Sequence, residues 1–193
     1  MRKKKLSKNL ETYVKYYDFL TPEECETTVT QLEKINWQEH TFYQPHNGEY
    51  KSYDHELSVS HDDFAMKTTI SQKIWHFIRK YVVEDHAHCS DWYSGWNGYT
   101  IPRFNKYSVD TQMKIHCDHI HSMFDGQRKG VPVLTILGAL NDDYEGGELM
   151  MWNDTVIELK AGKVMIFPSN FLYPHEVKLV TKGTRYSFVS WVW

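Results

Sequence analysis

The sequence predicts a mainly β fold that is supported by helices. From residue 97 onward, short runs of β-branched and aromatic residues recur at regular spacing between turn residues, which is typical of a sandwich or barrel. Before residue 97, two segments carry apolar residues at helical spacing instead. Aromatic residues make up 15% of the chain, and such rings suit strand surfaces and the walls of a cleft. We therefore expect helices that pack as buttresses against a sheet.

The N-terminal elements are a short strand over residues 13–19 and then a helix from Thr21 to about Ile35. Thr21 is a residue type that caps helices, and Pro22 suits the first helical position. Glu24 lies three residues after Thr21, where a capping box requires an acidic side chain. These three residues predict where the helix begins.

Residues 37–60 are predicted to be irregular or weakly stranded, with a turn at 45–48. A second, longer helix is expected to start near Asp62 and Asp63, because acidic residues at a helix start are stabilised by its dipole. Its apolar positions are Ile70, Ile74, Phe77, Ile78, Tyr81 and Val82. The segment 85–89 contains two histidines and a cysteine, and we interpret it as a polar loop because no second ligand cluster lies nearby.

The remaining elements are strands. They are expected at 99–107, 111–120, 131–139, 149–152, 156–159, 164–167 and 185–193, with a turn at 141–147. Nothing in the sequence marks a second domain, so we expect one domain over 13–193, with helical support at 21–83 and a β core at 97–193. Residues 1–12 begin with a basic run and are expected to form a disordered tail.

The composition is ordinary for a soluble globular protein, with 41% hydrophobic and 24% charged residues. The 22 basic and 25 acidic residues give a net charge of −3, which does not indicate a nucleic-acid partner. No apolar run is long enough to span a membrane. Cys25, Cys89 and Cys117 have no paired spacing, so we expect a reducing, cytoplasmic setting. We also expect the protein to be a monomer.

Residues 116–118 give the strongest indication of a functional site. Alternate side chains of a strand share a face, so His116 and Asp118 can point into one cavity while Cys117 points away. His175 would complete a set of two imidazoles and one carboxylate, which is typical of non-haem Fe(II) oxygenases. Arg185, ten residues later, offers a planar fork of donors that can grip a carboxylate.

Other residues of these segments have simpler interpretations. His119 and His121 form a competing pair of imidazoles, which we assign to the cleft rim or to solvent. Gly146 and Gly147 are interpreted as turn residues and not as a phosphate-binding loop, because no helix is expected after them. The strand that carries Arg185 should place Trp191 on the same face.

The ordered set His116-Cys117-Asp118, Glu145-Gly146-Gly147-Glu148-Leu149, His175 and Arg185 resembles the Fe(II) and 2-oxoglutarate-dependent dioxygenases, most closely their prolyl 4-hydroxylase-like branch. The N-terminal segment 19–25 is similar to the entry helix of that branch. The resemblance implies a double-stranded β-helix, a jelly-roll and cupin-like core. It also implies Fe(II), 2-oxoglutarate and O2 as cofactors, with ascorbate to keep the iron reduced.

The resemblance further implies roles for single residues. His116, Asp118 and His175 would bind Fe(II), and Arg185 would hold the far carboxylate of 2-oxoglutarate. Prolyl hydroxylases of this layout often have lysine at that position, so arginine argues against close kinship with the collagen-type enzymes. Tyr107 would hydrogen-bond the same carboxylate, although it could instead be an aromatic core residue. Two further residues are expected at the pocket: Thr135 as a cofactor contact, and Trp191 near iron and substrate.

A prolyl residue in a protein or peptide is the expected substrate, hydroxylated with release of succinate and CO2. Hydroxylation of a free amino acid or other small molecule is the alternative, and a nucleic-acid demethylase is disfavoured by the charge. A module that binds 2-oxoglutarate or iron without turnover is the alternative outside the enzymes.

Overall fold

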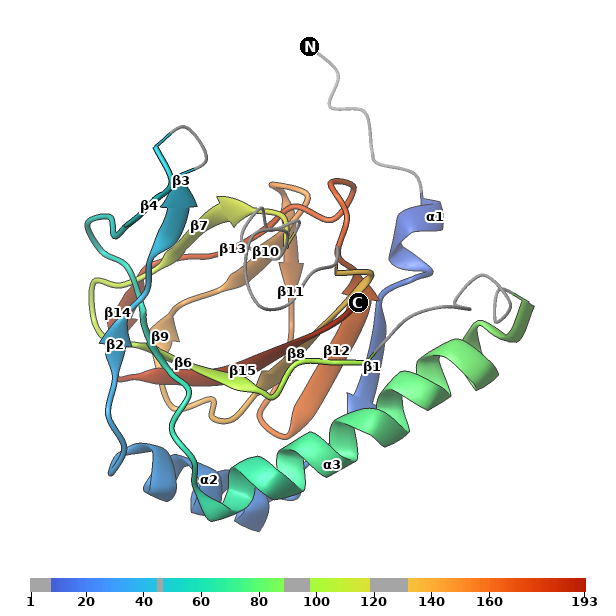
Figure 1. Cartoon of the computed structure of the whole chain (residues 1–193), viewed down its shortest axis with the longest axis horizontal. Helices are drawn as coiled ribbons and strands as arrows, with labels where there is room; N and C mark the ends of the chain where they lie inside the picture. The colour runs from blue at the N-terminus through green and yellow to red at the C-terminus, as the bar shows by residue number, and fades with distance from the viewer. Residues whose placement is uncertain (1–7, 45–46, 89–97, 119–131) are drawn as a thin grey trace.

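The computed structural model describes residues 8–44, 47–88, 98–118 and 132–193, which form two facing β-sheets with helices on one side (Figure 1). The larger sheet has the order β1-β12-β8-β15-β6-β5-β2, namely Lys15–Asp18, Lys163–Pro168, Leu134–Ala139, Arg185–Val192, Arg103–Tyr107, Ser58–Ser60 and Gln38–Glu39. The smaller sheet has the order β11-β10-β13-β7, namely Thr155–Ile157, Leu149–Met151, His175–Val177 and Met113–His116. All pairings between these strands are antiparallel. The expected mainly β, jelly-roll-like core is confirmed.

Two strand pairs and the helices complete the described chain. The pairs are β3 (Phe42–Gln44) with β4 (Glu49–Lys51), and β9 (Glu145–Gly146) with β14 (Val180–Lys182). The helices are α1 (Lys8–Glu11), α2 (Pro22–Leu32) and α3 (Ala65–Arg79), and α3 continues as a π-helix, η1 (Lys80–Asp85). Figure 1 shows α2 and α3 beneath the larger sheet, on the side away from β7 and β13. Within the described residues, no helix combines the length and the apolar character that a membrane crossing requires.

Strand β15 shows how the larger sheet separates two cores. All eight of its residues are buried, although a strand at the surface would alternate. Val189 and Trp191 belong to the core between the sheets, whereas Tyr186 and Phe188 belong to the core under the helices. Arg185 shares the parity of Trp191 and therefore faces the interior between the sheets, as the sequence predicts.

Helix α2 begins as predicted. The Thr21 hydroxyl accepts a hydrogen bond from the Glu24 amide at 3.2 Å, and the Glu24 carboxylate accepts one from the Thr21 amide at 2.9 Å. This is the capping box, with Pro22 in the first turn. The helix ends at Leu32 and not near Ile35.

Helix α3 begins at Ala65, two to three residues later than predicted. The acidic residues that suggested an earlier start are used differently. The side chain of Asp63 pairs with the buried ammonium group of Lys67 at 3.0 Å, and the Asp62 carbonyl accepts from the same group at 3.0 Å. The N-cap is Phe64, which makes no side-chain capping bond.

Several strands differ from the prediction. The expected strand over 111–120 is shorter, because β7 ends at His116, where its pairing with β13 also ends. The expected strand 99–107 is regular only from Arg103. Segment 37–60 contains the short strands β2 to β5, and the predicted turn at 45–48 lies partly outside the described residues. Strands β9, β13 and β14 have no counterpart in the sequence analysis.

The segment expected to be a tail also differs in part. Residues 8–11 form the helical turn α1, and the Tyr173 hydroxyl donates to the Leu10 carbonyl at 3.1 Å. Residues 1–7 and Cys89 lie outside the described residues. Cys25 and Cys117 are free thiols.

Candidate active site

Two neighbouring strands of the smaller sheet bring His116 and His175 together. His116 is the last residue of β7, His175 is the first residue of β13, and the two are direct register partners. Side chains opposite each other in an antiparallel pair lie close together, and these two ring centroids are 4.4 Å apart. His175 follows Asp118 by 57 positions in the sequence, and this single strand pairing brings the two segments together.

Asp118 lies two residues beyond β7 and completes the group. Its Oδ1 is 3.4 Å from His116 Nε2, and its Oδ2 is 3.7 Å from His175 Nε2. The three side chains each offer one ligand atom, and these atoms all lie within 4.8 Å of one another. Asp118 and His175 are buried, whereas His116 is half-buried. The structure therefore brings together the three residues predicted to bind metal.

Both histidines are held by their other ring nitrogen. His116 Nδ1 lies 2.8 Å from the Lys114 carbonyl, and His175 Nδ1 lies 3.1 Å from the Tyr173 carbonyl. A carbonyl oxygen only accepts, so each Nδ1 carries the proton and each Nε2 presents a lone pair to the group. This is the tautomer that metal-binding histidines need.

Asp118 is oriented from the larger sheet. The hydroxyl of Thr135 on β8 donates to Asp118 Oδ2 at 2.7 Å, and it lies 2.7 Å from the Ser169 hydroxyl, which therefore donates to it. Burial alone would raise the pKa of Asp118, but the electrostatic influence of His175 and His116 and the hydrogen bond from Thr135 outweigh it and hold that pKa well below its usual range. Burial lowers the pKa of His175, partly offset by Asp118. The carboxylate of Asp118 is thus ionised in the folded protein.

Arg185 is a buried cation with no carboxylate partner among the described residues. Its side chain is 2% exposed, and Nη1 donates to the Ser187 hydroxyl at 3.2 Å. Nε is buried and has no hydrogen-bond partner. The guanidinium lies over the ring of Tyr107, 5.0 Å from its centroid. An unpaired buried charge is costly, so this position favours an anion as an added partner.

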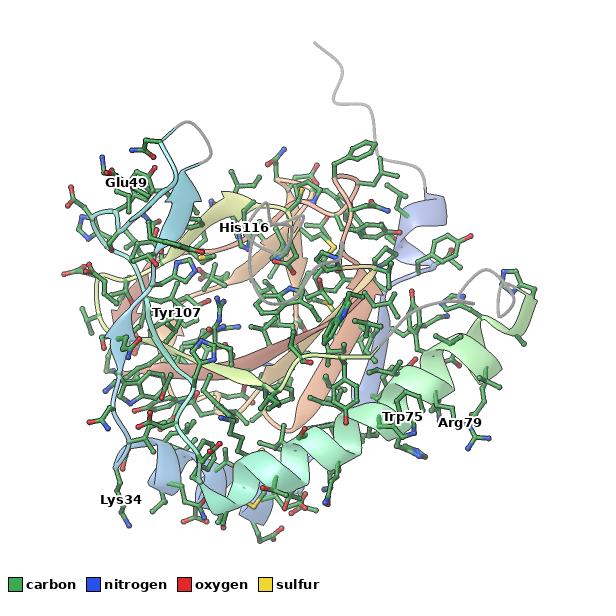
Figure 2. The ribbon with its side chains drawn as sticks, viewed as in Figure 1. Lys34, Glu49, Trp75, Arg79, Tyr107 and His116 are labelled. Atoms are coloured by element: carbon green, nitrogen blue, oxygen red, sulfur yellow. The ribbon has the colours of Figure 1, made fainter. Side chains whose placement is uncertain are left out.

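Tyr107 and Arg185 are register partners on β6 and β15 of the larger sheet. Figure 2 shows Tyr107 in the interior between the two sheets. Gly147 passes close to this pair: a Cβ at Gly147, which has a φ of 65°, would lie 3.3 Å from Arg185 Cδ. A side chain there would press on the arginine, so glycine is required by both the backbone and the space.

A cavity connects the metal-ligand candidates with residues of the larger sheet. Its lining residues are Arg103, Asn105, Tyr107, Met113, His116, Asp118, Thr135, Leu137, Leu149, His175, Val177, Val189 and Trp191. Trp191 is 9% exposed, and its buried Nε1 has no hydrogen-bond partner in the part of the chain that the structure describes. Arg185 lies behind Tyr107 and lines a neighbouring cavity of about 190 Å³, together with Tyr144, Gly147 and Lys160.

Arg103 is the charged lining residue that the sequence analysis missed. It shares the parity of Tyr107 on β6, so strand alternation from Tyr107 would have placed it inside the cavity. Its guanidinium lies over the ring of Trp191, 5.1 Å from the centroid, and Nε donates to Asn105 Oδ1 at 3.2 Å. Burial lowers the pKa of Arg103, whereas Tyr107 and Asp118 raise it.

The donor set fits a ferrous ion. Two imidazole nitrogens and one carboxylate oxygen from a single face are the ligands typical of non-haem Fe(II) oxygenases, and they leave the opposite positions open. The buried, unpaired Arg185 separately fits the far carboxylate of a bound dicarboxylic acid. Both halves of the expected cofactor set thus have matching residues.

The chain was compared with known proteins. Residues 102–193 match the sequence profile described as the 2OG-Fe(II) oxygenase superfamily. Residues 102–193 are a 2OG-Fe(II) oxygenase superfamily segment. It contains the candidate iron ligands as well as Tyr107 and Arg185, and the cofactors of the superfamily are Fe(II), 2-oxoglutarate and O2.

One curated relative is a PKHD-type hydroxylase of Stenotrophomonas maltophilia (strain R551-3), which is 32% identical over 99 residues. This alignment covers 49% of the chain and 43% of the relative, so the chain spans less than half the length of the curated relatives that it matches.

Two solved structures of prolyl hydroxylases share the fold. A prolyl-4-hydroxylase of Pseudomonas putida has a TM-score of 0.65 at 16% identity, and the alignment covers 93% of this chain and 91% of that one. A prolyl hydroxylase of Trichoplax adhaerens, in complex with a hypoxia inducible factor peptide fragment, has a TM-score of 0.63 at 17% identity, with 94% and 84% covered. At these identities the likeness shows the fold, which the 2OG-Fe(II) oxygenase resemblance predicts.

The remaining predicted residues stay predictions. Thr135 was expected as a cofactor contact, and in the structure its hydroxyl hydrogen-bonds Asp118. Trp191 lines the cavity, as its expected nearness to substrate requires. His119 and His121 lie outside the described residues.

Proposed function

We propose that this protein is an Fe(II)- and 2-oxoglutarate-dependent dioxygenase that hydroxylates a prolyl residue in a protein or peptide. The observation that carries the proposal is the combination of the His116, Asp118 and His175 group with the buried, unpaired Arg185. A metal site alone would fit many reactions. A metal site together with a buried cation that lacks a carboxylate partner favours a chelating dicarboxylic acid as co-substrate.

His116, Asp118 and His175 would hold Fe(II) from one face. When bound, Fe(II) and 2-oxoglutarate supply, with O2, the oxidising power to hydroxylate a C–H bond and release succinate and CO2. Arg185 would hold the far carboxylate of the co-substrate, with the Tyr107 hydroxyl as a second donor. The apolar walls of the cavity, among them Leu137 and Val189, would exclude water from the reacting carbon.

The prolyl preference is supported by the kind of protein that shares this fold. The Pseudomonas putida and Trichoplax adhaerens structures are both described as prolyl hydroxylases, and the second holds a peptide. The apolar side chains and Trp191 that line the cavity have the chemical character that suits the ring of a proline.

The test is anaerobic loading with Fe(II) and 2-oxoglutarate, followed by O2 and a panel of proline-containing peptides. Succinate and a mass gain of one oxygen on proline are the expected products. His116→Ala and Asp118→Ala should abolish succinate formation. His76→Ala, which removes an exposed histidine from α3, is the matched control and should not.

The outcomes separate the proposal from its alternatives. Slow succinate formation without stimulation by any peptide would keep the dioxygenase and reject the prolyl peptide substrate. Tight 2-oxoglutarate binding without succinate would indicate a non-catalytic module. Normal turnover by His116→Ala would reject the metal assignment altogether.

A further inference from the structure

Arg103 is a cation that lines the cavity of the candidate iron ligands, and the proposed reaction assigns no role to it. It lines the same cavity as the metal-ligand candidates, whereas Arg185, which is proposed to hold the far carboxylate of the co-substrate, lines the neighbouring cavity. Removing an arginine from full hydration is unfavourable, so a guanidinium placed in a cavity wall points to a partner. The contacts that Arg103 makes in the structure indicate the chemistry of that partner.

The contacts of Arg103 leave one end of its guanidinium free. Nε donates to Asn105, and the flat face of the group lies over Trp191. Within the described residues Arg103 forms no ion pair, and its two terminal nitrogens donate to no side chain. Stacking on the face and a hydrogen bond at Nε fix the plane of the group, and they leave the two terminal nitrogens for a bidentate contact in that plane.

Two carboxylates lie near Arg103 in the described part of the chain, Asp118 and Glu56. Asp118 is the one acidic residue among those that line the cavity, and it accepts from Thr135 between the two histidines. Glu56 does not line the cavity; its Oε2 is 3.2 Å from Nδ1 of the buried His40, and its Oε1 is buried without a hydrogen-bond partner among the described residues. Neither forms an ion pair with Arg103 in the described part of the chain.

The net charge expected in the cavity with Fe(II) and 2-oxoglutarate bound also favours an anionic partner for Arg103. The two positive charges of Fe(II) and the one of Arg185 cancel the two negative charges of 2-oxoglutarate and the one of Asp118. Arg103 then adds one positive charge that nothing lining the described cavity neutralises. A carboxylate, with a single negative charge and two oxygens in a plane, matches both this charge and the free edge of the guanidinium.

We propose that Arg103 is a specificity-determining residue that binds a carboxylate of the substrate close to the carbon that is oxidised. This inference rests on the proposed function and narrows its substrate class to acids. Three sources of that carboxylate share the same chemistry: an acidic side chain beside the target proline, the C-terminus of a peptide that ends in proline, and the carboxylate of free proline.

The test measures binding without turnover. The protein is loaded with Mn(II) and 2-oxoglutarate, and line broadening of ligand protons by the paramagnetic ion reports which compounds bind beside the metal. The probes are matched pairs: L-proline and L-prolinamide, acetylated peptides with an internal proline followed by Glu or Gln, and peptides that end in proline as the acid or the amide. The pair with the larger difference identifies the source of the carboxylate.

For the unmodified protein, we expect one acid to bind at least about tenfold more tightly than its neutral partner, since a hydrogen-bonded charge pair exceeds a neutral contact by that much or more. Arg103→Met keeps an apolar stem but removes the guanidinium that lies over Trp191, and it should remove the preference. Arg103→Lys keeps the charge but not the fork and should retain part of it. Lys106→Met, on the same strand but packed over Trp37 outside the cavity, is the matched control and should retain all of it.

Two results would overturn the inference. One is equal binding of every acid and its neutral partner, and the other is a preference for the acid that survives in Arg103→Met. In both cases broadening of 2-oxoglutarate itself would show that the co-substrate site is intact. Failure of the proposed function has a different signature, because 2-oxoglutarate would then show no broadening in the unmodified protein.

Discussion

The hydroxyl of Thr135 is the contact that ties the candidate iron ligand Asp118 to the larger sheet, and its removal tests the site without touching a ligand. Thr135→Val keeps the shape and deletes the oxygen. Thr135 and Ser169 are each 1% exposed and Asp118 is 4% exposed, so water does not replace the lost group. The deletion removes a 2.7 Å hydrogen bond to a carboxylate and leaves the Ser169 donor without its partner.

Each of these two losses has an expected size. A hydrogen bond to a charged group contributes about 1.5–3 kcal/mol, and a buried donor without a partner costs about 1–3 kcal/mol. Since Ser169 can turn toward another acceptor, we expect Thr135→Val to lower the free energy of unfolding by about 3 kcal/mol. Outer contacts of this kind also set metal affinity, and their loss weakens it about 10- to 100-fold.

The assay is anaerobic titration with Fe(II) or Mn(II), combined with urea unfolding of the metal-free protein. Thr135→Ser retains the hydroxyl and is the control, and Ser169→Ala closes a double-mutant cycle that isolates the outer hydrogen bond. If Thr135 instead contacts 2-oxoglutarate, Thr135→Val would weaken 2-oxoglutarate and leave metal affinity within twofold of the Thr135→Ser value. That result would refute the assignment of Thr135 to Asp118.

Three further predictions follow from other buried groups. Arg185→Met should abolish the rise in thermal stability caused by 2-oxoglutarate, while the unliganded protein melts no lower than the unmodified one, because replacing an unpaired buried charge by an apolar side chain relieves desolvation; a lower melting temperature without ligand would contradict this. His86 is 1% exposed, and neither of its ring nitrogens has a hydrogen-bond partner among the described residues. Burial lowers its pKa from 6.5, so the folded state binds the proton less well and stability is lost as the pH falls below about 6.5. His86→Phe should stabilise the protein by about 1 kcal/mol and flatten that decline in urea unfolding measured from pH 5 to 8, whereas an unchanged slope would assign it to other groups. Gly138→Ala places a Cβ 2.1 Å from the ring of Phe188 and should destabilise by about 2–3 kcal/mol, with Gly98→Ala, where no atom lies within 4 Å but φ is 150°, as the comparison for backbone strain alone.

The candidate ligands are predictable from the sequence because their chemistry is rare in combination. His116, Asp118, His175 and Arg185 are polar residues at strand ends or on an otherwise apolar strand, and together they match one kind of metal site. The strand that carries His175 is not predictable in the same way. It has three residues and follows Pro174, so it shows no periodicity, and its formation depends on pairing with β7 and β10.

The helices show the same division between local and distant causes. The start of α2 is encoded within four residues, by the capping box of Thr21 and Glu24, and is predicted correctly. The start of α3 is misplaced by two to three residues because Asp63 is used by Lys67, a buried lysine whose other partners are backbone carbonyls. Arg103 is missed for a different reason. The resemblance assigns no role to its position, and only its shared parity with Tyr107 on β6 indicates that it faces the cavity.

The two sheets supply different halves of the site, and this division explains which contacts between them matter. The smaller sheet holds the two histidines through one register pair, whereas the larger sheet holds Arg185 on its longest strand. The distance between these anchors limits the length of a dicarboxylic acid that can reach both. The Thr135 hydrogen bond to Asp118 is a direct polar link between them, and the glycine at 147 lets the β9–β10 turn approach Arg185 closely. A change at either position should therefore alter the match between site and acid, so that Thr135→Val and Gly147→Ala would shift the preference between 2-oxoglutarate and its one-carbon-longer analogue even where each still binds.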